Sequence, residues 1–293
     1  MKKAIKRFVL AITMGITAVS ASAQALTIGG KGFTESLLIV EITKQYLTSK
    51  GFSVEAKTGL GTAVVRKALL NGQLDMYWEY TGPALVNFHK KPGVPRQEMV
   101  QALNELDAPN HVKWLPSSDV NNTYALAMNK DVADELGIKD MSDLSRVMKE
   151  GKRLKIAVNA EFYARKDGMR PMEEFYELQF PREDIVRMDS GLTYNALKDR
   201  KVDIALVFAT DGRIPAFNFM LIKDNKNYHV AQDMTPVVRL ETLGKHPELE
   251  QLLRDISSKL DSTKMSALNA QVDVDRKTPE QVAADFLSTA GLM

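Results

Sequence analysis

Aromatic side chains stand at the ends of several predicted strands, which is where an open α/β sheet lines a ligand cleft. Tyr80 ends one predicted strand, Tyr124 begins another, and Phe208 ends a third. Lys31 follows a predicted strand near a helix N-terminus, where a small anion is favoured, and Arg165 is a second candidate cation. These residue types favour binding of a small charged molecule, although each one alone also fits a core or surface position.

Patterns that would indicate catalysis are missing from the sequence. The four histidines lack metal-ligand spacing, and neither a Gly-x-Ser-x-Gly motif nor a phosphate-binding loop is present. The Gly-Leu-Gly run at residues 59–61 lacks the third glycine of a dinucleotide site. Zero cysteines exclude disulfides, thiolate metal sites and a cysteine nucleophile. We therefore predict a binding protein, not an enzyme, with no catalytic residue, metal or cofactor; a secreted hydrolase is the less favoured alternative.

The first 25 residues have the features of a cleaved secretory leader. Four basic residues stand within positions 2–7, an apolar run covers residues 8–19, and small residues offer cleavage after Ala23 or Ala25. The apolar run is short for a bilayer span, so an uncleaved membrane anchor is the weaker alternative. We expect a signal peptide over residues 1–25 and a mature protein in a bacterial periplasm.

Length and composition describe an ordinary globular protein. The 293 residues, 44% hydrophobic and 26% charged, allow one large or two medium domains and exclude disordered, collagen-like and multi-span membrane proteins. Without the four leader cations, 35 Lys and Arg face 37 Asp and Glu, a net charge of −2. Such a chain lacks the excess positive charge that is typical of nucleic-acid-binding proteins.

Strand-like and helix-like patterns alternate along the mature chain, which indicates an α/β fold with mainly parallel sheets. The predicted strands cover residues 26–28, 52–57, 74–78, 123–128, 154–158 and 204–208, and a tight loop is expected at 58–61. The predicted helices cover residues 35–49, 62–71, 131–136, 141–150, 171–178 and 192–199, and three further pieces lie between 246 and 287.

Two segments of the chain resemble each other. Residues 68–82 and 196–212 both run from a helix end through a Leu-Asp or Val-Asp pair into a strand and a threonine-containing loop. Coincidence between two βα units explains this as well as a pair of similar lobes does. If the lobes are similar, each presents the carboxyl end of a strand to a shared cleft.

Eight short motifs occur in an order and spacing that resemble one protein family. They are residues 31–36 (KGFTES), 59–62 (GLGT), 75–82 (DMYWEYTG), 121–126 (NNTYAL), 161–162 (EF), 165–168 (RKDG), 191–194 (GLTY) and 210–213 (TDGR). In these the chain is similar to the periplasmic substrate-binding components of osmoprotectant ABC importers, which carry glycine betaine, choline and related quaternary ammonium compounds. The motifs span nearly all of the mature chain.

The resemblance implies a two-lobed, type II-like periplasmic binding protein with two sheets joined by two crossover strands. Residues 121–126 and 209–214 would be the crossovers and the hinge for closure over the ligand. Lobe one would then comprise residues 26–123 and 215–293, with the C-terminal helices packed on it, and lobe two residues 124–214.

The resemblance also implies site residues. Tyr80, Tyr124 and Phe208 would form three walls of an aromatic box, and the fourth position aligns with Gln232, which has no ring. Lys31 and Arg165 would meet a ligand carboxylate. The remaining candidates from the matching motifs are Thr81, Asn122, Phe162, Thr210 and Asp211.

Because one wall of the aromatic box is missing, the sequence allows several ligands. Lys31 and Arg165 favour a carboxylate-bearing ligand over plain choline, whereas Gln232 and Pro83, which stands where the family often has a threonine, allow an aromatic betaine or a derivatised amino acid. We expect a monomer that delivers its solute to a permease and an ATPase. A receptor of the same fold that signals to a membrane sensor is a further alternative.

Overall fold

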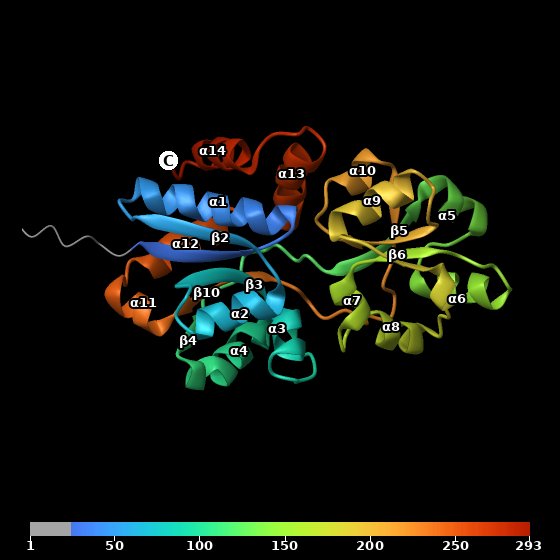
Figure 1. Ribbon diagram of the computed structural model, residues 1–293, viewed down its shortest axis with the longest axis horizontal. Helices are drawn as coiled ribbons and strands as arrows, with labels where there is room; N and C mark the ends of the chain where they lie inside the picture. Colours follow the sequence, from blue (N-terminus) through green and yellow to red (C-terminus); the bar gives the residue numbers. More distant parts are fainter. Residues whose placement is uncertain (1–24) are drawn as a thin grey trace, which may run out of the picture.

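Residues 25–293, which the computed structural model describes, form two lobes that lie side by side (Figure 1). Each lobe is built around a five-stranded sheet, so the predicted two-lobed α/β fold is confirmed. The sheets are mixed and not mainly parallel as expected, because parallel and antiparallel pairings are equal in number in each. Among these residues, no helix combines the length and the apolar character of a membrane span. The signal-peptide prediction falls on residues 1–24 and the following alanine, and lies outside the described residues apart from Ala25.

The sheet of lobe one has the strand order β2-β1-β3-β10-β4. Its first three strands pair in parallel, whereas β10 pairs antiparallel with both β3 and β4. The strands are β1 (Leu26–Lys31), β2 (Val54–Leu60), β3 (Met76–Tyr80), β4 (Val112–Trp114) and β10 (Met234–Arg239).

Helices cover both faces of this sheet, because successive strand residues point to opposite sides. Met76 and Trp78 of β3 pack towards α1 and the C-terminal helices, and Tyr77 packs towards α2, α3 and α4 (Figure 1). The helices of lobe one are α1 (Thr34–Ser49), α2 (Thr62–Leu70), α3 (Thr81–Asn87), α4 (Met99–Asp107), α11 (Leu240–Lys245), α12 (Leu249–Ser258), α13 (Ser262–Asp273) and α14 (Pro279–Thr289).

The sheet of lobe two repeats this plan with the order β7-β6-β8-β5-β9. Again three strands pair in parallel, and an antiparallel strand that enters from the other lobe, β5, lies beside them. The strands are β5 (Tyr124–Asn129), β6 (Ile156–Val158), β7 (Ile185–Arg187), β8 (Ile204–Phe208) and β9 (Phe219–Ile222).

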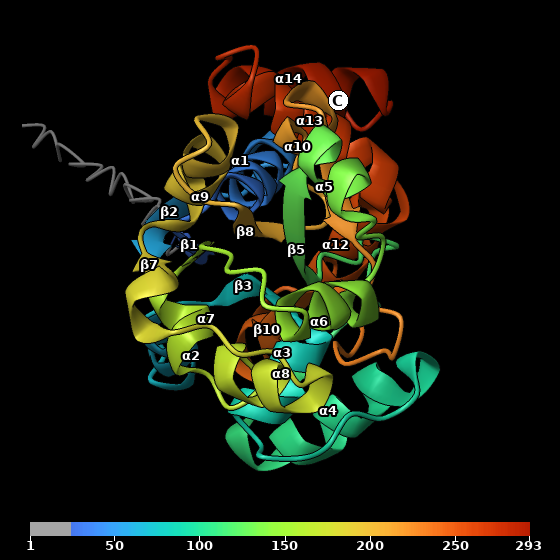
Figure 2. The ribbon, with the colours of Figure 1, turned by 90° about the vertical axis from the view of Figure 1, so that its right-hand side faces the viewer.

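Figure 2 looks onto lobe two and shows its helices on both sides of the sheet. α5, α9 and α10 lie on one side, and α6, α7 and α8 lie on the other. Their bounds are α5 (Lys130–Leu136), α6 (Met141–Lys149), α7 (Ala160–Ala164), α8 (Met169–Tyr176), α9 (Ser190–Lys198) and α10 (Arg213–Ala216). Short 3₁₀ helices lie at η1 (Arg96–Glu98), η2 (Ala108–Asn110) and η3 (Arg182–Asp184).

The two segments that resemble each other in sequence occupy equivalent places. Each runs through the middle strand of its sheet, β3 in lobe one and β8 in lobe two. In both lobes that strand pairs in parallel on one side and antiparallel on the other.

The second crossover lies later in the chain than residues 209–214, so that expected position is wrong. β9 pairs antiparallel with β5, which keeps the chain in the sheet of lobe two as far as Ile222. The connection back to lobe one therefore runs through residues 223–233, and β10 follows it. The outward connection runs through residues 115–123, and the last residues of the expected stretch 121–126 already belong to β5.

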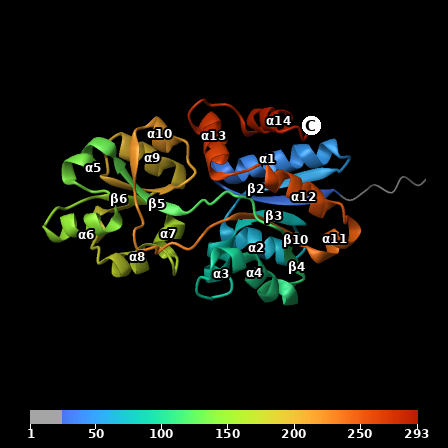
Figure 3. The same ribbon diagram turned by 180° about the vertical axis from the view of Figure 1, so that it is seen from behind.

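The two connecting segments run beside each other between the lobes (Figure 3). The Asn122 amide donates to the Gln232 carbonyl at 3.0 Å, and Asn121 forms an isolated antiparallel bridge with Asp233. The Met234 amide donates to the Val120 carbonyl at 2.9 Å. This paired ribbon is the covalent link between the lobes.

Most predicted elements lie within a few residues of their observed bounds, and β8 matches its prediction. The tight loop expected at 58–61 is an exception, because β2 continues to Leu60, which pairs with Lys31 across a register shift. β10 was not predicted, since Pro236 inside it cannot donate to a ladder and is rare in central strands.

Candidate functional site

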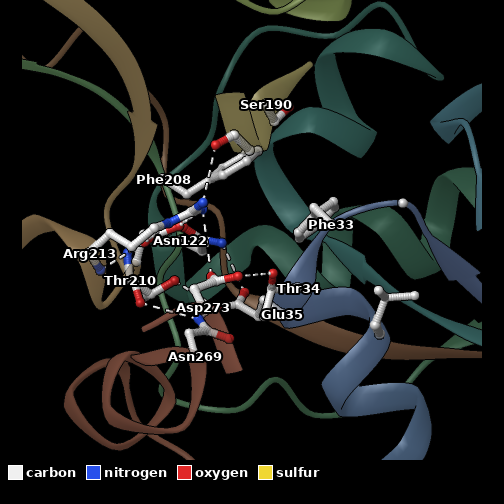
Figure 4. Close-up of a pocket in the computed structure, with 14 residues that line it drawn as sticks. Phe33, Thr34, Glu35, Asn122, Ser190, Phe208, Thr210, Arg213, Asn269 and Asp273 are labelled. Atoms are coloured by element: carbon white, nitrogen blue, oxygen red, sulfur yellow. Dashed lines mark hydrogen bonds and ion pairs between the residues drawn. The ribbon is translucent and has the colours of Figure 1, made fainter. Parts of the chain in front are cut away.

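A cavity of about 60 Å³ lies at the seam between the lobes. It brings together the predicted residues Lys31, Tyr80, Asn122, Tyr124, Arg165, Phe208 and Gln232. Phe33, Thr62, Pro83, Asn159, Glu161 and Ser190 complete its lining. A second cavity of about 160 Å³ adjoins it and shares Phe33, Asn122, Ser190 and Phe208 (Figure 4).

Strand ends and helix starts position these side chains. Phe33 immediately precedes α1, Tyr80 precedes α3, and Asn159 precedes α7. The side chain of Asn159 caps its helix by accepting a hydrogen bond from the Phe162 amide at 2.6 Å. The cleft therefore lies where open α/β sheets bind ligands, at the carboxyl ends of their strands.

Four rings form a continuous row along the seam. Phe33 lies between Tyr80 and Phe208, with ring centroids at 6.2 Å and 5.1 Å. Phe208 in turn stacks on Tyr124 at 5.2 Å. Phe33 was not among the predicted site residues, although it belongs to the KGFTES motif, which was the signal that could have identified it.

Phe162 supports this row from behind. It is fully buried, does not line the cavity, and its ring lies 5.0 Å from that of Tyr124. Burial raises the pKa of Tyr124 to about 12 even though the positive charge of Arg165 acts in the opposite direction. The Tyr124 ring is thus a neutral phenol at physiological pH.

Lys31 is paired within the protein. Its Nζ lies 2.5 Å from Glu79 Oε1 and 5.3 Å from the centre of the Tyr80 ring. The side chains of both Lys31 and Glu79 are buried, at 8% and 0% exposure. A ligand carboxylate would therefore compete with Glu79 for this ammonium group.

Arg165 is also paired. Its guanidinium donates two hydrogen bonds to Asp167, at 2.8 and 2.6 Å, and lies 5.2 Å from the centre of the Tyr124 ring. Burial lowers the pKa of Arg165, but the hydrogen bonds to Asp167 and the nearby Tyr124, Asp167 and Glu161 together outweigh it, and the net direction is upward. The same contact lowers the pKa of Asp167 against the effect of its burial.

Gln232 lies in the returning connection and lines the cavity with Tyr80, Tyr124 and Phe208. It is buried, with 5% exposure. Its backbone amide donates to Asn121 Oδ1 at 2.8 Å. Within residues 25–293, no hydrogen bond engages its side-chain amide, which is thus available to a ligand.

The other predicted residues lie around this cavity. Thr81 is buried beside the returning connection, where its hydroxyl contacts the Ala231 carbonyl and the Asp233 amide. Thr210 and Asp211 line the adjoining cavity (Figure 4). There Asp211 forms a two-point ion pair with Arg213, at 2.9 and 2.6 Å.

Glu35 is a site residue that the sequence reasoning missed. It is 3% exposed and lines the adjoining cavity at the start of α1. Burial raises the pKa of Glu35, and hydrogen bonds from Thr210, Tyr80, Asn269 and Asn122 oppose that rise. Within the described residues, no group of three or more His, Cys, Asp or Glu side chains is arranged to hold a metal ion.

Comparison with known proteins identifies the family of this chain. Residues 24–289 match the model of the substrate binding domain of ABC-type glycine betaine transport systems. A Pseudomonas aeruginosa protein named glycine-betaine-binding protein is 42% identical over 98% of this chain and 94% of its own length.

Solved structures agree with this assignment. The apo structure of YehZ from Escherichia coli is 31% identical and superposes with a TM-score of 0.69, covering 92% of this chain and 100% of that one. A structure described as a glycine betaine/carnitine/choline ABC transporter is 26% identical, with a TM-score of 0.75 and coverage of 91% and 99%. The chain therefore belongs to the family of substrate-binding domains of ABC-type glycine betaine transport systems.

Proposed function

We propose that this chain is a periplasmic binding protein that captures a quaternary ammonium or zwitterionic solute between its lobes and delivers it to the permease and ATPase of an ABC importer. Family membership supports the transport role. The names of its relatives support the ligand class, since they refer to glycine betaine and, in one solved structure, also to carnitine and choline. Solutes of this class share a methylated, permanently charged nitrogen.

The observation that carries this proposal is the row of rings at one interlobe cavity. Tyr80, Phe33, Phe208 and Tyr124 present aromatic surface from both lobes to the same space. A methylated ammonium group has no N–H to donate, so its recognition depends on ring faces and on apolar contact. Each such contact gains strength when closure removes water.

The charges around the cavity favour a cation. Lys31 and Arg165 are matched by Glu79 and Asp167, and Glu161 adds a further carboxylate to the lining, 3.8 Å from Arg165. The carboxylate of a ligand would meet Lys31 and Arg165, which already have acidic partners. The positive nitrogen therefore contributes the larger part of the attraction, and a zwitterion binds by sharing Arg165 or Lys31 with its acidic partner.

Gln232 narrows the range of ligands further. It replaces one aromatic wall with an amide that has no partner within the described residues, and a methyl surface offers none. A ligand with a polar group near this amide binds better than compact glycine betaine. An aromatic betaine or a derivatised amino acid has this character.

Native mass spectrometry of the mature protein purified from periplasm tests the proposal. We expect a monomer that carries a small molecule with a quaternary ammonium group, released on denaturation and exchangeable for added choline or glycine betaine. Long incubation with either compound should return it chemically unchanged.

A bound solute without a positive nitrogen, or failure of both added compounds to bind after refolding from denaturant, would contradict the ligand class. A new product after incubation would show that the chain is an enzyme.

A further inference from the structure

The carboxylate of Glu35 is the most fully hydrogen-bonded side chain at the seam (Figure 4). Its Oε1 accepts from Tyr80 Oη at 2.6 Å and from Asn122 Nδ2 at 2.9 Å. Its Oε2 accepts from Thr210 Oγ1 at 2.5 Å and from Asn269 Nδ2 at 3.1 Å. An ionised carboxylate has about four such acceptor positions, so donors fill all of them.

These four donors come from four different parts of the fold. Tyr80 ends β3 in lobe one, and its ring lines the ligand cavity. Asn122 lies in the outward connection, Asn269 lies in α13, and Thr210 follows β8 in lobe two. One side chain therefore contacts the aromatic row, the hinge and both lobes.

The bond to Thr210 depends on the arrangement of the lobes. Thr210 reaches Glu35 across the seam, and Asn269 Nδ2 also donates to the Thr210 carbonyl at 3.2 Å. Rotation about the connecting segments that parts the lobes separates Thr210 from both partners, whereas Tyr80 and Asn269 stay in lobe one with Glu35. The complete set of four hydrogen bonds thus exists only when the lobes are closed.

We propose that Glu35 is a positioning residue that couples lobe closure to the placement of the Tyr80 ring in the ligand cavity. Its carboxylate accepts a hydrogen bond from the Tyr80 hydroxyl in lobe one and another from the Thr210 hydroxyl in lobe two. In the open protein Glu35 has one donor fewer, so closure and the fixed ring stabilise each other. This role rests on the proposed function in one respect, which is that the Tyr80 ring belongs to a ligand site.

Glu35→Gln tests the coupling with almost no change of shape. The amide turns one acceptor atom into an NH₂ donor, which must then face a donor from Asn122 or Asn269. Glu41→Gln is the matched control, because Glu41 lies on the same helix, is also buried, and bonds within residues 25–293 only to Lys44 and Gln45 of that helix.

Closure is measured directly as a distance between two spin labels. The chain has no cysteine, so cysteines introduced at Lys91 and Lys166 are the only labelling sites. Both residues are exposed and flank the contact between Asn87 and Asp167, which face each other across the seam. Distances are recorded without ligand and with saturating glycine betaine or choline, alongside calorimetric affinities.

We expect Glu35→Gln to reduce the closed population and to weaken binding of the better of the two compounds about ten- to a hundredfold, the range for a lost hydrogen bond to a charged group. Glu41→Gln should change neither. Thr210→Val, which removes the lobe-two donor, should mimic Glu35→Gln, and the double variant should be hardly worse than either single one.

Additive effects of the two substitutions, or distances and affinities equal to those of the unmodified protein, would overturn the role of Glu35. If the unmodified protein binds neither compound, the ligand proposal fails instead. The role of Glu35 is then decided by the distances without ligand, where identical distributions for Glu35→Gln and the unmodified protein reject it.

Discussion

At Arg165 the proposed ligand site and an internal ion pair meet. Its guanidinium is held by Asp167, lies over Tyr124 and lines the cavity. If the cavity binds solute as proposed, Arg165 attracts the carboxylate of a zwitterion and repels the nitrogen of a plain cation.

We expect Arg165→Ala to weaken glycine betaine binding about ten- to a hundredfold, since it removes a charge-assisted contact of roughly 1.5–3 kcal/mol. Choline binding should be unchanged or tighter, because Asp167 loses its cation and attracts the ligand nitrogen. Calorimetric titration with both compounds separates the two effects.

Arg170→Ala is the control, because Arg170 also lies over a tyrosine of lobe two, at 6.0 Å, but is largely exposed and lines neither seam cavity. Equal losses for glycine betaine and choline in Arg165→Ala would show that the residue only supports the fold.

If the cavity binds solute as proposed, Gln232 decides which members of the ligand class fit. Restoring a ring with Gln232→Tyr should tighten glycine betaine binding from a few-fold to about thirtyfold, the effect of one cation–π contact of roughly 0.5–2 kcal/mol. Gln232→Leu removes the amide without supplying a ring, and it should give a smaller gain. If titration shows the same affinity for Gln232→Tyr as for the unmodified protein, the side chain at 232 does not contact the ammonium group.

At the scale of elements, the loop after β8 and helix α13 lie next to each other across the seam (Figure 1). A Cβ built on Gly212 would overlap the Cβ of Ala270 and lie 2.6 Å from its Cα. Gly212 has an ordinary helical backbone, with φ −67°, so alanine there is excluded only by this contact. We therefore expect closure to require glycine at this position.

Gly212→Ala should therefore act on closure and leave folding intact. Overpacking costs roughly 1–3 kcal/mol, and the lobes avoid it by staying open, so ligand affinity should fall about five- to a hundredfold. Thermal unfolding without ligand should match the unmodified protein. Gly244→Ala, which meets no atom within 4 Å, is the control and should keep full affinity. A lower melting temperature with unchanged affinity would place the strain inside a lobe instead.

At the scale of the whole molecule, the paired segments 115–123 and 223–233 join two similar lobes. We expect the lobes to turn about them, and ligand contacts from both sides of the seam to shift the population towards the closed form, because only that form provides all of them. Small-angle scattering should show a smaller radius of gyration at saturating ligand. An unchanged radius with independently confirmed binding would mean that the lobes do not move.

The sequence predicted the parts of this molecule that depend on local pattern. Tyr80, Tyr124 and Phe208 could be placed at the cleft because each lies at a strand end, and the strands themselves are clearly patterned. The second crossover could not be located, because β9 has only four residues and Pro236 makes the sequence of β10 untypical of a central strand. These two strands are recognisable only from the sheets they join.

The charge partners were beyond the reach of sequence pattern for a different reason. Glu79 lies 48 positions from Lys31, and the donors to Glu35 are spread from Tyr80 to Asn269. No local spacing links residues so far apart, and only the packing of the lobes brings them together. For that reason Lys31 looked like a free anion-binding group in the sequence, although it is paired in the structure. Arg165 differs, because its partner Asp167 lies only two positions away and was overlooked inside the RKDG motif.

The central claim is that ring faces at the seam bind a positive nitrogen. The most direct test is calorimetric titration of the mature protein with choline and with its uncharged isostere, in which a carbon atom replaces the nitrogen. The two molecules have nearly the same shape, so they differ in the attraction of a charge to the rings and the surrounding carboxylates. We expect the isostere to bind at least about thirtyfold more weakly, since a desolvated cation–π contact contributes about 2 kcal/mol. Equal affinity for the two compounds, or no binding of choline, would contradict the account.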